Sequence, residues 1–204
     1  YFQYSKLFYI VNTYRNPQEL INVAGQFIMK NPSQQKKKLH SSKHLTKPIK
    51  LYYTQNEKDT LKQIISSLPY PQEIMVLGRN NKDIYNYIDQ EYEQLPNNYF
   101  KYKEKMFRYL TIHKSKGLES DIVIIINLKD DNLGIPTKIK DEKILRFVNN
   151  TKDYYPFEEE RRLFYVALTR TKTYCYLLVP SEKASIFVRE LTKYREYIEI
   201  VSPE

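Results

Sequence analysis

Short runs of apolar, β-branched and aromatic residues alternate along this chain with stretches of helical periodicity. The predicted strands span residues 6–12, 49–54, 73–78, 108–113, 121–128, 174–180 and 197–201. The predicted helices span residues 17–30, 57–68, 82–90, 157–171 and 181–194. This alternation predicts an α/β fold, in which a parallel sheet carries helices on both faces and ligands gather at the carboxyl ends of the strands.

Three stretches sharpen or interrupt this pattern. Residues 122–126 are continuously apolar, which is typical of a central parallel strand covered on both faces. Residues 31–48 are rich in Lys, Ser and Gln without periodicity and predict a loop. Residues 129–156 are polar and contain two prolines, so we expect a long excursion with one short helix near 141–148. The chain, residues 1–204, is then expected to be one domain that carries this excursion.

The local sequence also predicts helix starts and the state of the single cysteine. Asn16 before Pro17, and Ser181 after Pro180, are typical of an N-cap residue at the start of a helix. Cys175 lies within an apolar run, so we expect a buried thiol without a disulfide partner.

Composition limits the class of protein. The chain is 41% hydrophobic and 28% charged, which is enough apolar material for a core and excludes a disordered tail. No apolar run reaches the roughly 20 residues of a membrane span. No signal peptide opens the sequence. These features predict a cytoplasmic protein that does not engage a membrane.

The positive charge is concentrated near the start of the chain. The formal net charge is +9, and residues 1–50 hold nine Lys or Arg against the single acid Glu19. The remaining residues carry nearly equal numbers of both signs. A solvated loop is one interpretation, and a face that attracts nucleic-acid phosphates is the other, because clustered cations release counterions there.

The sequence lacks the common motifs of a self-contained catalytic site. Its four glycines are widely separated, so it has neither a G-x-x-x-x-G-K-[ST] phosphate loop nor a G-x-G-x-x-G loop. Its histidines and cysteine show no zinc-site spacing, and His40 and His44 share a Lys- and Ser-rich loop. If the chain takes part in catalysis, it therefore does so with donated side chains.

Three segments carry residue types suited to such donation. In the segment 12–17, Tyr14 offers a stacking face for a base and Arg15 a guanidinium for phosphate, although an ordinary turn explains them as well. In the segment 111–119, hydroxyls, lysines and a glycine can surround phosphates, and Glu119 can accept hydrogen bonds from a sugar hydroxyl. A polar loop in which Gly117 adopts a positive φ is the structural alternative.

The third segment, 158–170, reads as an amphipathic helix with acids at its start. Leu163, Val166 and Ala167 form an apolar stripe that docks a helix on a sheet, and the acids match the helix dipole. Packing does not explain why Arg170 ends this helix.

In order and spacing, these segments resemble the later motifs of UvrD/Rep-like superfamily 1 DNA helicases. The tripeptide 13–15 resembles the fourth motif of the family, 111–119 the fifth and 159–170 the sixth, while 76–80 resembles the strand and turn between the fourth and fifth. The segment Gly134-Ile-Pro136 with its acidic-apolar continuation is similar to the helicase IV branch. The resemblance implies a RecA-like fold, a P-loop-NTPase-type sheet without the phosphate loop itself, in the second motor domain.

The resemblance also implies roles for individual residues. Tyr14 would stack on the adenine of ATP, Gly117 and Glu119 would meet its ribose, and Arg15 and Arg170 would act catalytically at the γ-phosphate. Single-stranded DNA is the implied partner along a second set of residues: Arg79, Asn80, Thr111, His113 and Ser115.

The rest of the ATP site is implied to lie elsewhere. The phosphate loop and the acids that bind Mg²⁺ belong to the first RecA-like domain of the same polypeptide, so this chain alone is expected to be inactive and to bind neither ATP nor Mg²⁺ by itself. Only 29 residues, 82 to 110, separate two of the motifs, which leaves no room for the large insertion of many relatives. Two other functions remain open: a helicase-like ATPase that remodels RNA polymerase, and a catalytically idle nucleic-acid-binding module.

Overall fold

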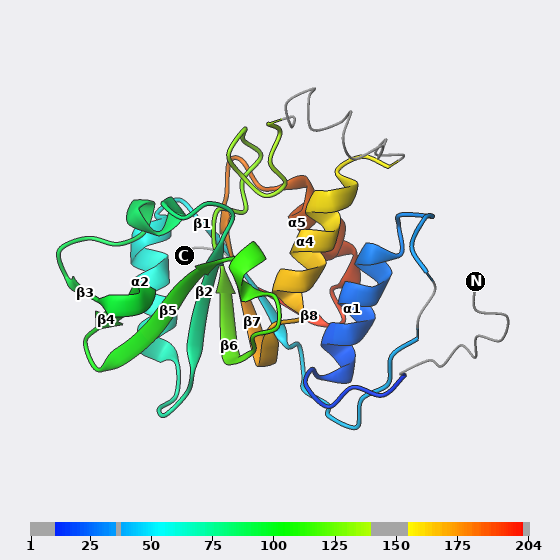
Figure 1. Ribbon diagram of the computed structural model, residues 1–204, viewed down its shortest axis with the longest axis horizontal. Helices are drawn as coiled ribbons and strands as arrows, with labels where there is room; N and C mark the ends of the chain where they lie inside the picture. The colour runs from blue at the N-terminus through cyan, green and yellow to red at the C-terminus, as the bar shows by residue number, and fades with distance from the viewer. Residues whose placement is uncertain (1–10, 36–37, 140–154, 202–204) are drawn as a thin grey trace, which may run out of the picture.

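The computed structural model describes residues 11–35, 38–139 and 155–201, which build an eight-stranded sheet between helices (Figure 1). The strand order is β3-β4-β5-β2-β6-β7-β1-β8, and the six strands from β5 to β8 in this order are parallel. The strands are β1 (Ile49–Thr54), β2 (Ile74–Gly78), β3 (Tyr92–Leu95), β4 (Tyr99–Tyr102), β5 (Lys105–Thr111), β6 (Ser120–Ile125), β7 (Thr171–Pro180) and β8 (Ile198–Val201). The predicted α/β class is confirmed.

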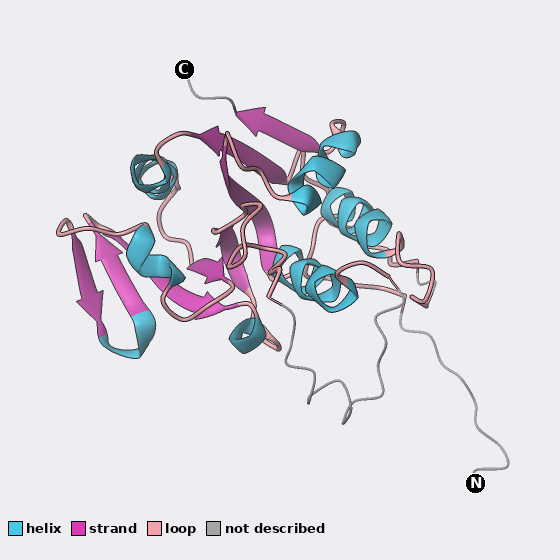
Figure 2. Ribbon diagram, turned by 90° about the horizontal axis from the view of Figure 1, so that it is seen from above, coloured by secondary structure: helices cyan, strands magenta, loops and turns pink. Residues whose placement is uncertain are grey.

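Helices cover both faces of the sheet (Figure 2). Helices α1 (Gln18–Ile28), α4 (Glu158–Leu168) and α5 (Ile186–Leu191) pack on one face, and α2 (Glu57–Ser67) packs on the other. Four short 3₁₀ turns complete the described structure: η1 (Asp83–Asn86), η2 (Pro96–Asn98), η3 (His113–Ser115) and η4 (Thr192–Tyr194). In the described part of the chain, no helix is both long and apolar enough to cross a membrane.

The two helical layers explain the continuously apolar central strands. In β6, Val123 and Ile125 belong to the core beneath α1, α4 and α5, whereas Ile122 and Ile124 belong to the core beneath α2. Every position of the apolar run 122–126 is buried, so the usual alternation with polar residues disappears there. Cys175 in the neighbouring β7 is fully buried in the first core, as predicted.

The region between β2 and β5 differs from the prediction. The helix expected over 82–90 is wrong, because only the 3₁₀ turn η1 forms there. The side chain of Asp83 accepts hydrogen bonds from the backbone N–H groups of Arg79 and Asn80, and such local bonding competes with a helix.

The next residues form an antiparallel hairpin, β3–β4, that was not predicted, so the sheet is mixed rather than wholly parallel. Stacked aromatic pairs support it, with ring centroids 4.9 Å apart for Tyr92 and Tyr102 and 5.6 Å apart for Phe100 and Phe107.

Two predicted helix caps are also wrong. Helix α1 begins at Gln18 with Pro17 in the N-cap position and no side-chain cap, because Asn16 bonds elsewhere. Helix α5 begins later than expected and is capped by Ser185, whose hydroxyl accepts from the N–H of Phe187 at 3.1 Å.

Some expectations concern residues outside the described ranges. Most of the predicted strand 6–12 and the whole of the short helix near 141–148 lie there. Within 31–48, the described residues form a loop as predicted, with one isolated bridge between Asn12 and His40. The described end of the 129–156 excursion, up to residue 139, likewise contains only turns, bends and one isolated bridge.

Candidate functional site

The four residues expected to bind ATP through their side chains lie around one edge of the sheet. Glu119 immediately precedes β6 and Arg170 immediately precedes β7, so both lie at the amino edge of these parallel strands. Nε of Arg15 donates to Oε2 of Glu119 at 2.6 Å, and Nη1 of Arg170 donates to the carbonyl of Leu118 at 3.2 Å. These residues lie at the amino edge rather than at the carboxyl edge, where the strand–helix alternation predicted ligands, and we call them the amino-edge cluster: Tyr14, Arg15, Glu119 and Arg170.

Arg170 is fixed in position by the end of α4. Its Nε donates to the carbonyl of Val166 at 3.0 Å, so the side chain folds back over the last turn of the helix. Burial lowers the pKa of Arg170 and the charge of Arg15 lowers it further, but a guanidinium keeps its proton in proteins. A cation at the carboxyl end of a helix also interacts favourably with the helix dipole. The side chain is thus a preorganised, partly desolvated positive charge.

Glu119 carries the negative charge of the cluster. The hydrogen bond from Arg15 holds the pKa of this carboxyl below its usual value, and the charges of Lys172 and Arg170 add to the lowering. Nζ of Lys172 lies 4.0 Å from Oε1 of Glu119. Lys172 was not among the predicted site residues, although its position two residues after Arg170 was a usable signal.

Asn16 connects two parts of the cluster that are distant in sequence. Its side-chain amide donates to the carbonyls of Thr169 and Thr171, at 3.2 and 2.6 Å, and the residue is buried. This bridge holds the segment of Tyr14 and Arg15 against the turn between α4 and β7. Nothing in the local sequence distinguishes this role from the cap that was predicted.

Tyr14 presents the exposed ring of the amino-edge cluster. It is 82% exposed, the highest value among the large hydrophobic side chains of the described residues. An exposed aromatic face beside cations is a suitable stacking surface for a planar heterocycle.

Gly117 allows the chain to cross from one edge of the sheet to the other. Residues 112–119 connect the carboxyl end of β5 with the amino end of β6. Gly117 adopts φ +85°, as expected, and a Cβ built on it would meet nothing within 4 Å. The requirement for glycine is therefore conformational rather than steric.

The residues expected to bind DNA lie at the opposite, carboxyl edge. His113 is an exposed residue at this edge. The part of its ring that is shielded from water lowers its pKa, and the positive charges of Arg79 and Lys116 lower it further. Ser115 is completely buried and donates to the carbonyl of Ile112 at 2.7 Å. Thr111 is also buried and accepts from the N–H of Lys114 at 3.3 Å. The hydroxyls of Thr111 and Ser115 therefore bond to the backbone of the 3₁₀ turn η3 and do not face solvent.

The turn of Arg79 and Asn80 lies at the same edge and is firmly held. Both backbone N–H groups donate to Oδ2 of Asp83, at 2.8 and 2.9 Å. The guanidinium of Arg79 pairs with Glu160 in the first turn of α4. Neither Asp83 nor Glu160 was predicted as a site residue, because their partners are visible only in the fold.

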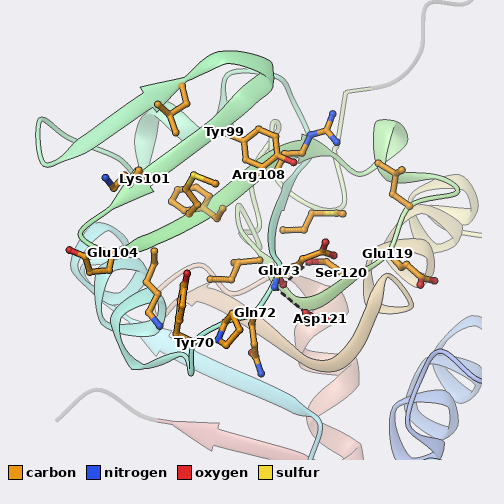
Figure 3. Close-up of a pocket in the computed structure, with 18 of the residues that line it drawn as sticks. Tyr70, Gln72, Glu73, Tyr99, Lys101, Glu104, Arg108, Glu119, Ser120 and Asp121 are labelled. Carbon is orange, nitrogen blue, oxygen red and sulfur yellow. Dashed lines mark hydrogen bonds between the residues drawn. The ribbon is translucent and has the colours of Figure 1, made fainter.

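A groove of about 880 Å³ begins at Glu119 and runs beneath the β3–β4 hairpin (Figure 3). Four of the exposed apolar side chains line it: Tyr70, Tyr99, Met106 and Leu118. Its lining mixes these with charges of both signs, so it does not resemble a phosphate pocket. Within the described ranges, no group of His, Cys, Asp and Glu could hold a metal ion.

Comparison with known proteins places this geometry in context. Residues 107–182 match the family described as the UvrD-like helicase C-terminal domain. The chain is 31% identical to DNA helicase IV of Escherichia coli K12 over 180 residues, which cover 88% of this chain and 25% of that protein. It is 28% identical over 213 residues to a "Probable DNA helicase" of Mycoplasma pneumoniae, covering 97% of this chain and 36% of that one.

A solved structure shows the same fold. The C-terminal domain of a possible DNA helicase from Lactobacillus plantarum WCFS1 superposes with a TM-score of 0.56 at 12% identity. The superposition covers 92% of this chain and 98% of the other. The chain thus spans a quarter to about a third of the length of the two curated relatives described above, but nearly the whole of this isolated domain.

Proposed function

Since the chain carries the C-terminal domain of the UvrD-like superfamily 1 helicases, we propose that it is the second motor domain of an ATP-dependent DNA helicase. In this function, the amino-edge cluster forms one wall of an ATP site. A first RecA-like domain of the same polypeptide forms the other wall and supplies the phosphate loop.

The observation that carries this proposal is the convergence of the cluster. The cluster is assembled from three segments of the chain. Arg15 and Glu119 are 104 positions apart, and Leu118 and Arg170 are 52 positions apart. A stacking ring, a carboxylate and two guanidiniums at one edge match the parts of a nucleoside triphosphate: base, sugar and phosphates. A catalytically idle module has no need to bring these groups together.

Each group has a defined task in this proposal. Tyr14 stacks on the adenine, and Glu119 accepts hydrogen bonds from the ribose. Arg15 and Arg170 approach the γ-phosphate and stabilise the negative charge that spreads over its oxygens during transfer to water. Arginines in this position accelerate phosphoryl transfer by about 10³–10⁵-fold.

Mg²⁺ belongs to the other wall in this proposal. The acid of the cluster and the acid next to it are already paired with cations: Glu119 with Arg15, and Asp121 with Lys172 at 3.4 Å. A site with this arrangement suits phosphate oxygens better than a metal ion. The chain therefore contributes positive charge and orientation, and the metal with its ligands comes from the first domain.

Single-stranded DNA is proposed to run along the carboxyl edge. His113 and the turn of Arg79 and Asn80 present donors there, whereas Thr111 and Ser115 support the backbone that carries His113. Because the segment 112–119 joins this edge to Glu119, a shift at the DNA edge can reach the ATP site through few residues.

The proposal is tested by comparing this chain alone with the polypeptide that includes a phosphate-loop domain. The longer protein should hydrolyse ATP and do so faster with single-stranded DNA, while the chain alone should stay at background. Appreciable turnover by the chain alone would contradict the half-site. A protein that responds to RNA polymerase but not to DNA would favour the remodelling function instead.

A further inference from the structure

Arg79 and Glu160 form an ion pair that joins two elements of the domain. Nε of Arg79 donates to both carboxylate oxygens of Glu160, at 3.0 and 3.2 Å, and Nη2 lies 2.9 Å from Oε1. The two side chains are only 23% and 10% exposed. A guanidinium that engages a carboxylate through two nitrogens fixes orientation as well as distance.

The Arg79 side of the pair belongs to a turn with little freedom. Asp83 accepts from the backbone N–H groups of Arg79 and Asn80, and it also accepts from the amide of Asn127 at 2.9 Å. Gly78 ends β2 directly before this turn, and an added Cβ there would collide with the Tyr109 hydroxyl. The position of this turn is therefore set by the carboxyl edge of the sheet.

The Glu160 side belongs to α4, the helix that leads to Arg170. Glu160 lies in the first turn of α4, and Arg170 follows its last turn. The eleven residues of this helix span about 16 Å at the usual rise per residue. Figure 1 shows α4 running beside the sheet, and it starts near the edge where strands end and finishes where they begin.

Further contacts make α4 a rigid connection between the two edges. Arg161 makes a two-nitrogen ion pair with Glu190 of α5, at 2.8 and 2.9 Å. Glu160 also accepts from the N–H of Thr137, in the segment that follows β6, at 3.1 Å. These contacts fix the first turn of α4, and the continuous hydrogen-bonded helix joins that turn to the turn that carries Arg170, so a displacement of Glu160 is carried along α4.

We propose that the Arg79–Glu160 pair couples the occupancy of the DNA edge to the placement of Arg170, both residues acting as positioning residues. Among the described residues, Nη1 of Arg79 has no hydrogen-bond partner, so a DNA phosphate can approach it while Glu160 holds the other nitrogens. The phosphate then competes with Glu160 for the charge of the Arg79 guanidinium, which weakens the ion pair that holds the first turn of α4. This inference rests on the proposed motor function.

The experiment uses the polypeptide that includes the phosphate-loop domain and compares Glu160→Gln with the unaltered protein. Three quantities are measured: ATP hydrolysis without DNA, hydrolysis at saturating single-stranded DNA, and the dissociation constant for DNA. Glu160→Gln should leave the DNA-free rate within about twofold and reduce the stimulation by DNA about tenfold, as is typical of a coupling between sites. DNA affinity should change much less than the stimulation.

Glu158→Gln is the matched control. Glu158 also lies in the first turn of α4, but its ion pair with Arg162 stays within that helix and does not connect α4 to another element. It should keep full stimulation. Arg79→Lys keeps the charge but loses the two-nitrogen geometry, and it should reproduce the loss even if Glu160→Gln folds poorly.

The outcomes separate the inference from the function on which it rests. Unchanged stimulation in a folded Glu160→Gln or Arg79→Lys protein would overturn the coupling, and so would equal loss of the DNA-free and DNA-stimulated rates. Absence of DNA-stimulated hydrolysis in the unaltered protein would overturn the proposed function itself.

Discussion

Nε of Arg15 donates a 2.6 Å hydrogen bond to Oε2 of Glu119, although 104 positions separate the two residues in the chain. Both side chains are partly exposed, at 32% and 44%, so the pair lies at the surface rather than in the core. Exposed pairs contribute little to stability. In the proposed function, a nucleotide that brings Arg15 to a phosphate and Glu119 to the sugar must separate the two side chains.

Sugar discrimination should depend on Glu119. With Glu119→Gln in the polypeptide that includes the phosphate-loop domain, we expect the preference for ATP over 2′,3′-dideoxy-ATP in kcat/KM to fall by about tenfold, since a hydrogen bond to a charged group is worth about 1.5–3 kcal/mol. The exposed Glu182→Gln should keep the preference. An unchanged preference in the Glu119 variant would remove Glu119 from the ribose contact.

The titration of Glu119 should depend on Arg15. The hydrogen bond from Arg15 is the main cause that lowers the pKa of Glu119, so Arg15→Ala should move this pKa up towards the usual carboxyl value. The pair stabilises the fold above the usual carboxyl pKa, and this contribution is lost as the pH falls through the lowered pKa of Glu119. Carbon-13 NMR of the side-chain carboxylates measures the shift.

Glu190 supplies the internal reference for that titration. Its pKa is also lowered, by hydrogen bonds from Arg161 and Lys30 that oppose the effect of burial, and none of these involves Arg15. The carboxyl of Glu190 should therefore titrate at the same pH in the unaltered protein and in Arg15→Ala. A Glu119 signal that does not move in the Arg15 variant would show that the two residues are not paired in solution.

Gly117 should be more costly to replace than Gly25. A left-handed backbone costs a residue with a Cβ about 1–2 kcal/mol, so Gly117→Ala should lower the free energy of unfolding by that amount. Gly25 lies within α1 with nothing within 4 Å of its added Cβ, and Gly25→Ala should raise stability by about 0.5–1 kcal/mol. Urea unfolding of both variants checks the contrast, and equal effects would contradict it.

The basic segment near the start of the chain offers lysines of two kinds. Lys38 and Lys47 are exposed, whereas Lys50 pairs with Glu199 at 3.2 Å and Lys43 bonds to the carbonyl of Lys172. If the exposed lysines contact single-stranded DNA, each replacement by Ala should reduce the slope of log affinity against log salt by about 0.7. Lys50→Ala should leave the slope unchanged. A flat salt response of the original protein would exclude this phosphate contact.

The core strands were predictable because burial on both faces leaves a signature in the local sequence. The apolar runs of β6 and β7 record that every position is covered, whichever helix covers it. The β3–β4 hairpin left no such signature. Its stability depends on contacts such as Phe100 with Phe107. The two strands have four residues each with Pro96 between them, which is too short for a helical or strand period to be recognised.

For the site, the sequence indicated residue types and order but not partners. Tyr14, Arg15, Glu119 and Arg170 could be singled out by their motifs, whereas their convergence at the amino edge depends on the order of strands in the sheet. Asn16 shows the limit clearly. Its neighbour Pro17 favours a helix cap, but two carbonyls more than 150 positions away bind its amide instead.

The most direct test of the account is ATP hydrolysis by the polypeptide with both motor domains when Arg170 is replaced by Ala. Arg162→Ala is the matched control, since Arg162 belongs to the same helix but is 55% exposed and pairs with Glu158. We predict that Arg170→Ala lowers kcat at saturating DNA by at least about a hundredfold with little change in nucleotide affinity, and that Arg162→Ala stays near the original rate. Near-normal turnover by a folded Arg170→Ala protein would contradict the assignment of this edge as a wall of the ATP site.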